Sequence, residues 1–399
     1  MSRIVFLNAK NINDSRGDLT IEVTIGLESG IQAIASVPQG KSRGKEEAFL
    51  LKAEKAVENV NQLIALVVKN KEFENSKELD EFLITLDGTN NKSKLGANAI
   101  LAVSIAFVRA LALEKKIPLW QEIRNLFEEE FKEISLDNGK NNFYKIPRLF
   151  VNIIGGGLHA KNNLDFQEYL IIPKTQNPAD AFEISKIIYN TVGDYLKEKY
   201  KNVSLADEGN FAPNLSDNEE PFLIIKEAMQ LAKLNNEIDL GLDAAASNVK
   251  LDSKKLFDWY INAKEKYNLF YLEDPFAEED FESFASLLNK VGNSTIIAGD
   301  DLTVTNFYRI RQAYEKKSIN GVIIKPNQIG TLTETIKAIK KAKELGLAII
   351  ISHRSGETND DFIADLAYGV GADGLKAGAP LAPERAVKYK RLIELVSKK

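Results

Sequence analysis

Six ionisable residues recur along the C-terminal half of the chain, each directly after a short apolar run or one position further on. They are Asp243, Glu273, Asp300, Lys325, His353 and Lys376, and the steps between them are 30, 27, 25, 28 and 23 residues. Each step has the length of one strand-plus-helix unit. Such a repeat predicts parallel strands whose carboxyl ends meet at one rim, with the six side chains together.

The segments between these residues support this reading. Strands are predicted at 238–242, 269–272, 295–298, 321–324 and 347–351, and helices at 253–267, 279–290, 303–317, 331–344 and 358–369. The roughly 250 residues available match a closed βα barrel. A doubly wound open sheet is the alternative, but no G-x-G-x-x-G motif follows an early strand.

A different pattern fills the N-terminal part. Three β-patterned runs, 3–9, 20–27 and 31–37, are separated by turn residues and predict an antiparallel meander. Helical patterning follows at 45–69, 76–86 and 95–115. We therefore expect an α+β capping domain over residues 1–132 and the barrel over 145–399, with a polar segment between them.

Composition narrows the class of protein. At 399 residues the chain is long enough for two domains, and it has no cysteine, which excludes disulfides and thiolate metal sites. A net charge of −5 argues against nucleic acid or an anionic membrane as the main partner. The first residues show no signal-peptide pattern, and the apolar stretch 99–108 is predicted to be a core helix. A cytoplasmic enzyme acting on a small molecule is expected.

The residue types at the rim indicate a reaction class. Asp243, Glu273 and Asp300 offer hard oxygen donors suited to Mg²⁺. Lys325 and Lys376 lie opposite them, and burial and a nearby cation would lower the pKa of either lysine. Such a base facing a metal-bound carboxylate predicts proton abstraction at the alpha carbon.

The segment after the fifth predicted barrel strand, Ser352–Thr358, adds an anion site. Arg354, Ser355 and backbone N–H groups at a helix start are typical of a phosphate or carboxylate cradle. Only two histidines occur, His159 and His353, both in Gly- or Ser-containing loops.

With these residues in view, the chain resembles the enolase (phosphopyruvate hydratase) family along essentially its whole length. The matching strings are DSRG (14–17), LDGTNNKSKLGANAILAVS (86–104), GGLHAKNNLDFQEY (156–169), DEGNFAPNL (207–215), LDAAAS (242–247), LEDP (272–275), GDDLTVTN (299–306), IKPNQIGTLTE (324–334), ISHRSGETND (351–360) and LKAGAP (375–380). The resemblance implies a two-domain enzyme that interconverts 2-phosphoglycerate and phosphoenolpyruvate with Mg²⁺.

The same resemblance implies roles. The implied catalytic groups are Glu208 as acid, Lys325 as base, Glu168, His159, His353 and Lys376. The implied substrate-binding residues are Gln167, Arg354, Ser355, Lys376, His159 and Ser42. Asp243, Glu273 and Asp300 would bind one Mg²⁺, and Ser42 a second. Because hydroxide leaves poorly, Glu208 is expected to be partly protonated under the influence of Glu168.

Departures from the family pattern cluster in loops. The first catalytic loop reads Gln-Gly-Lys-Ser-Arg-Gly over residues 39–44, where the family has Ser-Gly-Ala-Ser-Thr-Gly. Gly155 stands where the family has Asn, and Ala206 and Asn210 stand where it has Gly. These changes leave two alternatives open: an enolase-like scaffold or binding protein with an impaired lid, and a related lyase of the same superfamily.

The resemblance also implies a homodimer or higher oligomer. In the family dimer a glutamate of the second strand pairs with an arginine near the C-terminus. Glu22 matches the first residue, whereas Glu394 occupies the second position, and two facing acids would repel each other.

Overall fold

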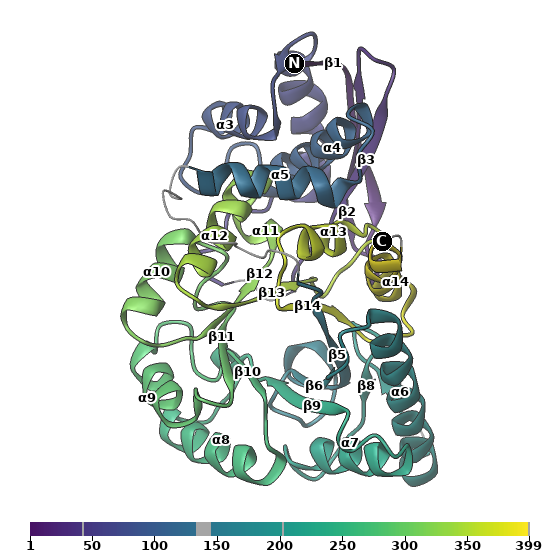
Figure 1. Cartoon of the computed structure of the whole chain (residues 1–399), viewed down its shortest axis with the longest axis vertical. Coiled ribbons are helices and arrows are strands. Elements are labelled where there is room, and N and C mark those ends of the chain that lie inside the picture. The colour runs from purple at the N-terminus through teal and green to yellow at the C-terminus, as the bar shows by residue number, and fades with distance from the viewer. Residues whose placement is uncertain (42–43, 133–144, 202, 398–399) are drawn as a thin grey trace.

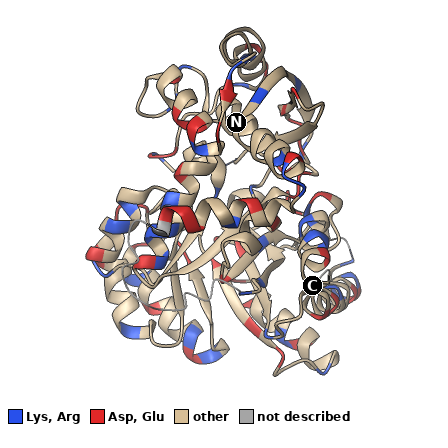
Figure 2. Ribbon diagram, turned by 45° about the horizontal axis from the view of Figure 1, so that its top comes forward, with Lys and Arg blue, Asp and Glu red and all other residues tan. Residues whose placement is uncertain are grey.

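The structure, a computed structural model, describes residues 1–41, 44–132, 145–201 and 203–397. A small sheet with helices on one side of it sits above a larger barrel, and the long helix α14 runs beside the barrel near the C-terminus (Figure 1). Acidic and basic residues are interspersed over the outer helices (Figure 2).

The N-terminal sheet contains four strands in the order β3-β2-β1-β4. The first three form the expected antiparallel meander, β1 (Ser2–Asn13), β2 (Leu19–Leu27) and β3 (Gln32–Val37). The fourth, β4 (Glu72–Phe73), pairs with the start of β1 and was not predicted, because two residues carry no periodic signal.

The helices of this domain lie on one side of the sheet (Figure 1). They are α1 (Ala53–Asn59), a π-helical turn (Val60–Ile64), α2 (Ala65–Val68), α3 (Ser76–Asp87), α4 (Ala97–Glu114) and α5 (Leu119–Lys132). Among the described residues, α4 is long and apolar enough to cross a membrane, but 83% of that window is buried inside the fold. It is the core helix that the sequence predicts.

The helix predicted at 45–69 begins later than expected, at Ala53. The preceding residues run along the barrel rim instead. The backbone N–H of Ala48 donates to the carbonyl of Gln328 at 2.8 Å, and that of Phe49 to the carbonyl of Asn91 at 2.7 Å. These long-range bonds satisfy backbone groups that a helix would have used.

The larger part is a closed barrel of eight strands. They are β5 (Arg148–Gly155), β6 (Glu168–Pro173), β9 (Ile238–Asp243), β10 (Tyr271–Glu273), β11 (Ile296–Gly299), β12 (Gly321–Ile324), β13 (Ala348–Ser352) and β14 (Gly374–Gly378). Pairing of β14 with β5 closes the ring. Strand β6 is antiparallel to both of its neighbours, and the remaining pairs of the ring are parallel. The predicted barrel is confirmed and the open sheet is excluded.

Helices surround the barrel (Figure 1). They are α6 (Pro178–Tyr200), α7 (Glu220–Leu231), α8 (Ser253–Tyr267), α9 (Phe281–Val291), α10 (Phe307–Glu315), α11 (Pro326–Ile329), α12 (Leu332–Glu344), α13 (Phe362–Gly369) and α14 (Pro383–Ser397). Short 3₁₀ turns (Gly157–His159 and Ala246–Asn248) follow β5 and β9, and a small hairpin of β7 (Ser204–Leu205) and β8 (Phe211–Ala212) extends the sheet beside β5.

Polar contacts fasten the N-terminal domain to the barrel. On α4, Arg109 donates to both carboxylate oxygens of Asp360 at 2.6 and 2.7 Å. On α3, the buried carboxylate of Asp80 accepts from the backbone N–H of Thr333 at 2.9 Å and from its hydroxyl at 2.6 Å. These contacts hold the N-terminal domain against the barrel.

Candidate active site

The strand-end residues converge on one rim, as their spacing predicts. Asp243 and Glu273 end β9 and β10 as direct neighbours in the ladder, and Asp300, Lys325 and His353 each follow the last residue of a strand. Lys376 lies within β14 beside Ser352 of β13. Parallel strands end at the same edge, so their terminal side chains gather in one place.

Lys376 joins three carboxylates. Its ammonium lies 2.7 Å from Glu273 Oε2, 3.0 Å from Asp243 Oδ2 and 3.1 Å from Glu168 Oε2. All four side chains are at most 4% exposed. Burial lowers the pKa of Lys376, but Asp243, Glu168 and Glu273 outweigh it and raise that pKa well above its ordinary value. This cluster links the proposed metal ligands to the carboxylate pair described below.

Lys325 contacts the third carboxylate of the rim, Asp300, through a short ion pair. The other oxygen of Asp300 accepts from the side-chain amide of Gln328 at 2.9 Å. Burial lowers the pKa of Lys325, but Asp300 outweighs burial and the net shift is upward. The predicted lowering of the pKa is therefore wrong for both rim lysines in the presence of the protein's own side chains alone. Gln328 was not recognised from the sequence, because it follows Lys325 inside a short helix rather than at a strand end.

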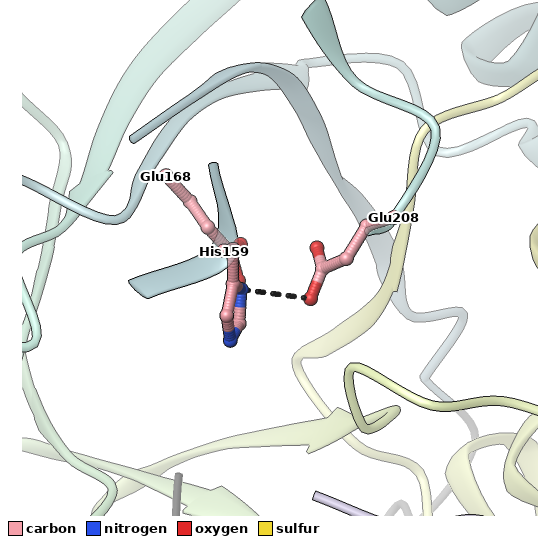
Figure 3. Close-up of side chains that lie close together, drawn as sticks. All are labelled: His159, Glu168 and Glu208. Carbon is pink, nitrogen blue, oxygen red and sulfur yellow. Dashed lines mark ion pairs between the residues drawn. The ribbon is translucent and has the colours of Figure 1, made fainter. Parts of the chain in front are cut away.

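Glu208 lies between the two histidines of the chain. Its Oε1 is 3.4 Å from His159 Nδ1 (Figure 3), and its Oε2 is 3.5 Å from His353 Nε2. Asn152 of β5 donates to Oε2 at 3.0 Å. His159 and Glu168 project toward Glu208 from the opposite side of the same space (Figure 3).

The pKa shifts of Glu168 and Glu208 differ from those that the sequence predicts. Burial and the neighbouring Glu208 raise the pKa of Glu168 well above its ordinary value. Burial also favours neutral Glu208, but His353, His159 and the cation of Arg385 outweigh it and lower the pKa of Glu208. The expected partial protonation of Glu208 is therefore wrong for this geometry, because Glu168 keeps the proton.

The predicted anion cradle is occupied by a carboxylate of the chain itself. Arg354 donates to both oxygens of Glu47 at 3.1 Å each, and to Asn327 Oδ1 at 2.9 Å. Both partners of this ion pair are nearly inaccessible to solvent. Glu47 was missed by sequence reasoning, since it lies in the segment predicted as helix.

The first loop lies over the cradle. The backbone N–H of Lys41 donates to Ser355 Oγ at 2.8 Å, and its ammonium lies 3.0 Å from Asp207. A Cβ at Gly40 would come within 2.0 Å of the guanidinium of Arg354, so glycine permits this close approach. Ser42, predicted as a ligand of the second Mg²⁺, lies outside the described residues.

Gln167 completes the set of predicted residues near the rim. Its amide nitrogen donates to Asp243 Oδ2 at 3.3 Å, while its Oε1 is buried and accepts no hydrogen bond within the described part of the chain. A buried amide oxygen without a donor has an unmet bond to offer a substrate group.

The donor set at the rim fits a hard cation. Asp243, Glu273 and Asp300 supply carboxylate oxygens, and Glu273 Oε1 is buried without a hydrogen-bond donor among the described residues. The most compact groups of possible ligand atoms, each within 4.8 Å, are His159 with Glu168 and Glu208, and Asp274 with Asp300 and Asp301. Only Asp300 of the predicted set belongs to either group.

Two departures from the family pattern meet in space. A Cβ at Gly155 would lie 1.9 Å from the side-chain nitrogen of Asn210. The resemblance implies Asn at the first position and Gly at the second, the reverse of this chain. Since the Asn210 side chain fills the space that a side chain at position 155 would need, the two departures are sterically compatible with each other.

Comparison with known proteins agrees with this geometry. The family model "Enolase, N-terminal domain" matches residues 4–123, and "Enolase, C-terminal TIM barrel domain" matches 143–249 and 248–398. The chain belongs to the enolase family. It is 39% identical to an enolase of Ehrlichia ruminantium (strain Welgevonden), covering 97% of this chain and 94% of that protein. It is 38% identical to enolase B of Dictyostelium discoideum, covering 98% and 93%.

Membership in the enolase family makes the chain a hydro-lyase, a phosphopyruvate hydratase acting on a small-molecule substrate, and Mg²⁺ is the general cofactor of that family. The resemblance drawn from the motif strings is thereby confirmed. Two buried residues around the site, Glu47 and Arg385, were not singled out by the motifs. Both reach it from distant elements, so no strand-end spacing marks them.

Proposed function

We propose that this enolase dehydrates 2-phosphoglycerate reversibly to phosphoenolpyruvate and water in glycolysis and gluconeogenesis, with Lys325 as base and Glu208 as acid. The observation that carries the assignment is the position of Lys376. Its ammonium contacts Glu168 on one side and Asp243 and Glu273 on the other, so the carboxylate pair and the proposed metal ligands form one connected buried site.

Substrate binding comes first in this mechanism. Arg354 and Ser355 hold the phosphate, and Gln167 and Lys376 hold the carboxylate. Since Arg354 is paired with Glu47, the phosphate competes with or shares that guanidinium. Mg²⁺ held by Asp243, Glu273 and Asp300 would supply positive charge where the substrate carboxylate becomes more negative. We propose a second Mg²⁺ near Ser42.

Proton transfer then follows from the side chains. Lys325, in its neutral form, takes the proton from C2, and the electrons of that C–H bond move toward the carboxylate. The C3–O bond breaks as Glu208 gives a proton to the departing hydroxyl, which leaves as water. Because oxygens of Glu168 and Glu208 lie within 4.8 Å of each other, and Glu208 helps to raise the pKa of Glu168, the proton that Glu168 keeps in the free site is available to Glu208.

Three further proposals concern the whole protein. We propose domains at residues 1–132 and 145–399, and the matched ranges of the two family models, 4–123 and 143–398, support them. We propose a cytoplasmic location, because enolases are generally cytoplasmic. We also propose a homodimer or higher oligomer, although Glu22 lies 2.8 Å from Lys10 and Glu394 lies 3.5 Å from Arg391 of the same chain. Sedimentation analysis tests the oligomer, and a monomer at micromolar concentration would contradict it.

The reaction is tested by following phosphoenolpyruvate formation from 2-phosphoglycerate at saturating Mg²⁺, with and without a chelator. The proposal expects turnover that the chelator abolishes, a loss of activity on the order of 10³-fold or more in Lys325→Ala, and unchanged activity in the control Lys290→Ala on the exposed surface of α9. Absence of turnover in the wild type would refute the reaction and favour a scaffold or a related lyase. Turnover surviving in Lys325→Ala would refute only the role of that lysine.

A further inference from the structure

Arg385 of α14 is a fully buried arginine whose guanidinium reaches the catalytic rim from outside the barrel. Its Nη1 lies 2.6 Å from His353 Nδ1 and donates to the carbonyl of Arg354 at 2.6 Å. Its Nη2 donates to the carbonyl of Ser355 at 2.6 Å. Through Arg385, the helix α14 therefore contacts three consecutive residues of the loop that follows β13.

The contact between Arg385 and His353 determines which ring nitrogen of the histidine carries the proton. A guanidinium has only donors and stays protonated at any physiological pH, so the ring nitrogen facing it must offer a lone pair. When Nδ1 accepts, the proton of the neutral imidazole is on Nε2. That nitrogen lies 3.5 Å from Glu208 Oε2. The ring is held with its acceptor toward Arg385 and its N–H toward the acid.

We propose that Arg385 is a positioning residue that fixes His353 as the neutral tautomer with its proton on Nε2 and aims that N–H at Glu208. The tautomer follows from the contact with Arg385 alone. Its part in catalysis rests on the proposed function, since it matters only if Glu208 handles a proton of the substrate.

This arrangement has a mechanistic consequence. While the guanidinium occupies Nδ1, His353 cannot take a second proton, so it does not compete with Glu208 for protons. It presents one N–H at 3.5 Å from the carboxylate, beside the hydrogen bond that Asn152 donates at 3.0 Å. Glu208 then has fixed partners on Oε2, and the side of the site that faces the leaving hydroxyl is organised before substrate binds.

The tautomer is tested directly by NMR of protein labelled with ¹⁵N in the histidine rings. The chain has only two histidines, so two spin systems are expected, and His159→Asn assigns them. For His353 in the folded wild type, we expect Nδ1 to give the shift of a nitrogen without a proton and Nε2 that of a nitrogen carrying one. A protonated Nδ1 in the wild type would overturn the proposal whatever the variants do.

The variants separate positioning from bracing of the loop. Arg385→Met removes the donors, and we expect the His353 shifts to move toward a mixture of tautomers, with kcat reduced on the order of 100-fold. Arg385→Lys keeps one donor and should restore the wild-type ring pattern and most of kcat. Loss of loop bracing alone would raise KM and leave the ring pattern unchanged. A wild-type pattern of His353 ring shifts in folded Arg385→Met would contradict the proposal.

A matched control comes from the same helix. Arg391 of α14 is bidentate to Asp365, at 2.8 and 2.9 Å, away from the site. Arg391→Met should leave the His353 signals and kcat as in the wild type. The assignment of the His353 tautomer and the proposed function are refuted by different results. A wild type without turnover but with the expected ring pattern refutes the proposed function and leaves the Arg385–His353 assignment standing, whereas active protein with protonated Nδ1 refutes only the assignment.

Discussion

Arg354 donates to both carboxylate oxygens of Glu47 at 3.1 Å, so the guanidinium proposed to bind the substrate phosphate already holds an internal anion. Glu47 comes from the segment between the first loop and α1, and Arg354 follows the end of the barrel strand β13. The pair therefore ties the N-terminal domain to the active site, and substrate binding must rearrange or share it.

The first prediction concerns this pair. Glu47→Gln removes the carboxylate that both guanidinium nitrogens of Arg354 contact, so the substrate-free protein should lose about 3–5 kcal/mol of stability. Phosphate from the substrate replaces that charge, so added 2-phosphoglycerate should raise the melting temperature more in the variant than in the wild type. Thermal unfolding with and without substrate measures both effects. Equal shifts in the two proteins would show that Glu47 does not compete for Arg354.

The second prediction tests the exchange between positions 155 and 210. Gly155→Asn alone places a side chain where that of Asn210 already lies, and it should cost about 1–3 kcal/mol from overpacking. Asn210→Gly in the same chain removes the obstacle and should recover most of that loss. Urea unfolding of the two single variants and the double variant measures the coupling. Additive effects would mean that the two positions changed independently.

The third prediction is a pH effect at the domain interface. Burial raises the pKa of Asp80 to about 6 from an ordinary value of 3.8, against the lowering effect of its bonds to Ser104 and Thr333. Between these two pH values the unfolded chain has released its proton while the folded chain keeps it. Stability therefore falls as pH rises through this range, by at most about 3 kcal/mol from this group.

Asp80→Asn isolates that contribution, because its amide oxygen still accepts from Thr333 but does not titrate. The unfolding free energy of the variant minus that of the wild type should increase as pH rises from about 4 to about 6 and then level off. Urea unfolding at several pH values gives this difference. A difference independent of pH would contradict the raised pKa.

The fourth prediction concerns Lys376. Lys376→Met leaves Glu168, Asp243 and Glu273 buried without their shared cation, which should cost about 3–5 kcal/mol in the presence of a chelator. Mg²⁺ should restore stability more strongly in this variant than in the wild type, because it supplies the missing positive charge. Lys290→Met serves as the surface control. Equal stabilisation of all three proteins by Mg²⁺ would place the ion elsewhere.

The rim was predictable because its signal is local. Each of Asp243, Glu273, Asp300, Lys325 and His353 ends or follows a strand that the apolar pattern reveals, and closure of the barrel brings them together. The motif strings added Glu168 and Glu208, which lie in the irregular first part of the barrel where spacing gives no guide.

What the sequence missed depends on contacts between distant segments. Residues 45–52 have helical periodicity, but the backbone N–H of Ala48 bonds to Gln328 at the barrel rim and that of Phe49 to Asn91 of the N-terminal domain. Glu47 and Arg385 reach the site only when the segment 45–52 and α14 fold against the strand ends. The prediction that Glu208 is partly protonated was wrong for the same reason, since Arg385 and both histidines face Glu208 and lower its pKa.

The division of labour between Lys325 and Glu208 is tested most directly by exchange of the C2 proton of 2-phosphoglycerate with deuterated solvent, read by NMR at saturating Mg²⁺. The account predicts that Glu208→Gln still exchanges the C2 proton while forming little phosphoenolpyruvate, because the base remains and the acid is gone. Lys325→Ala should lose both. Exchange in Lys325→Ala at the wild-type rate, or its absence from folded Glu208→Gln that still binds substrate, would contradict the assignment of Lys325 as the base.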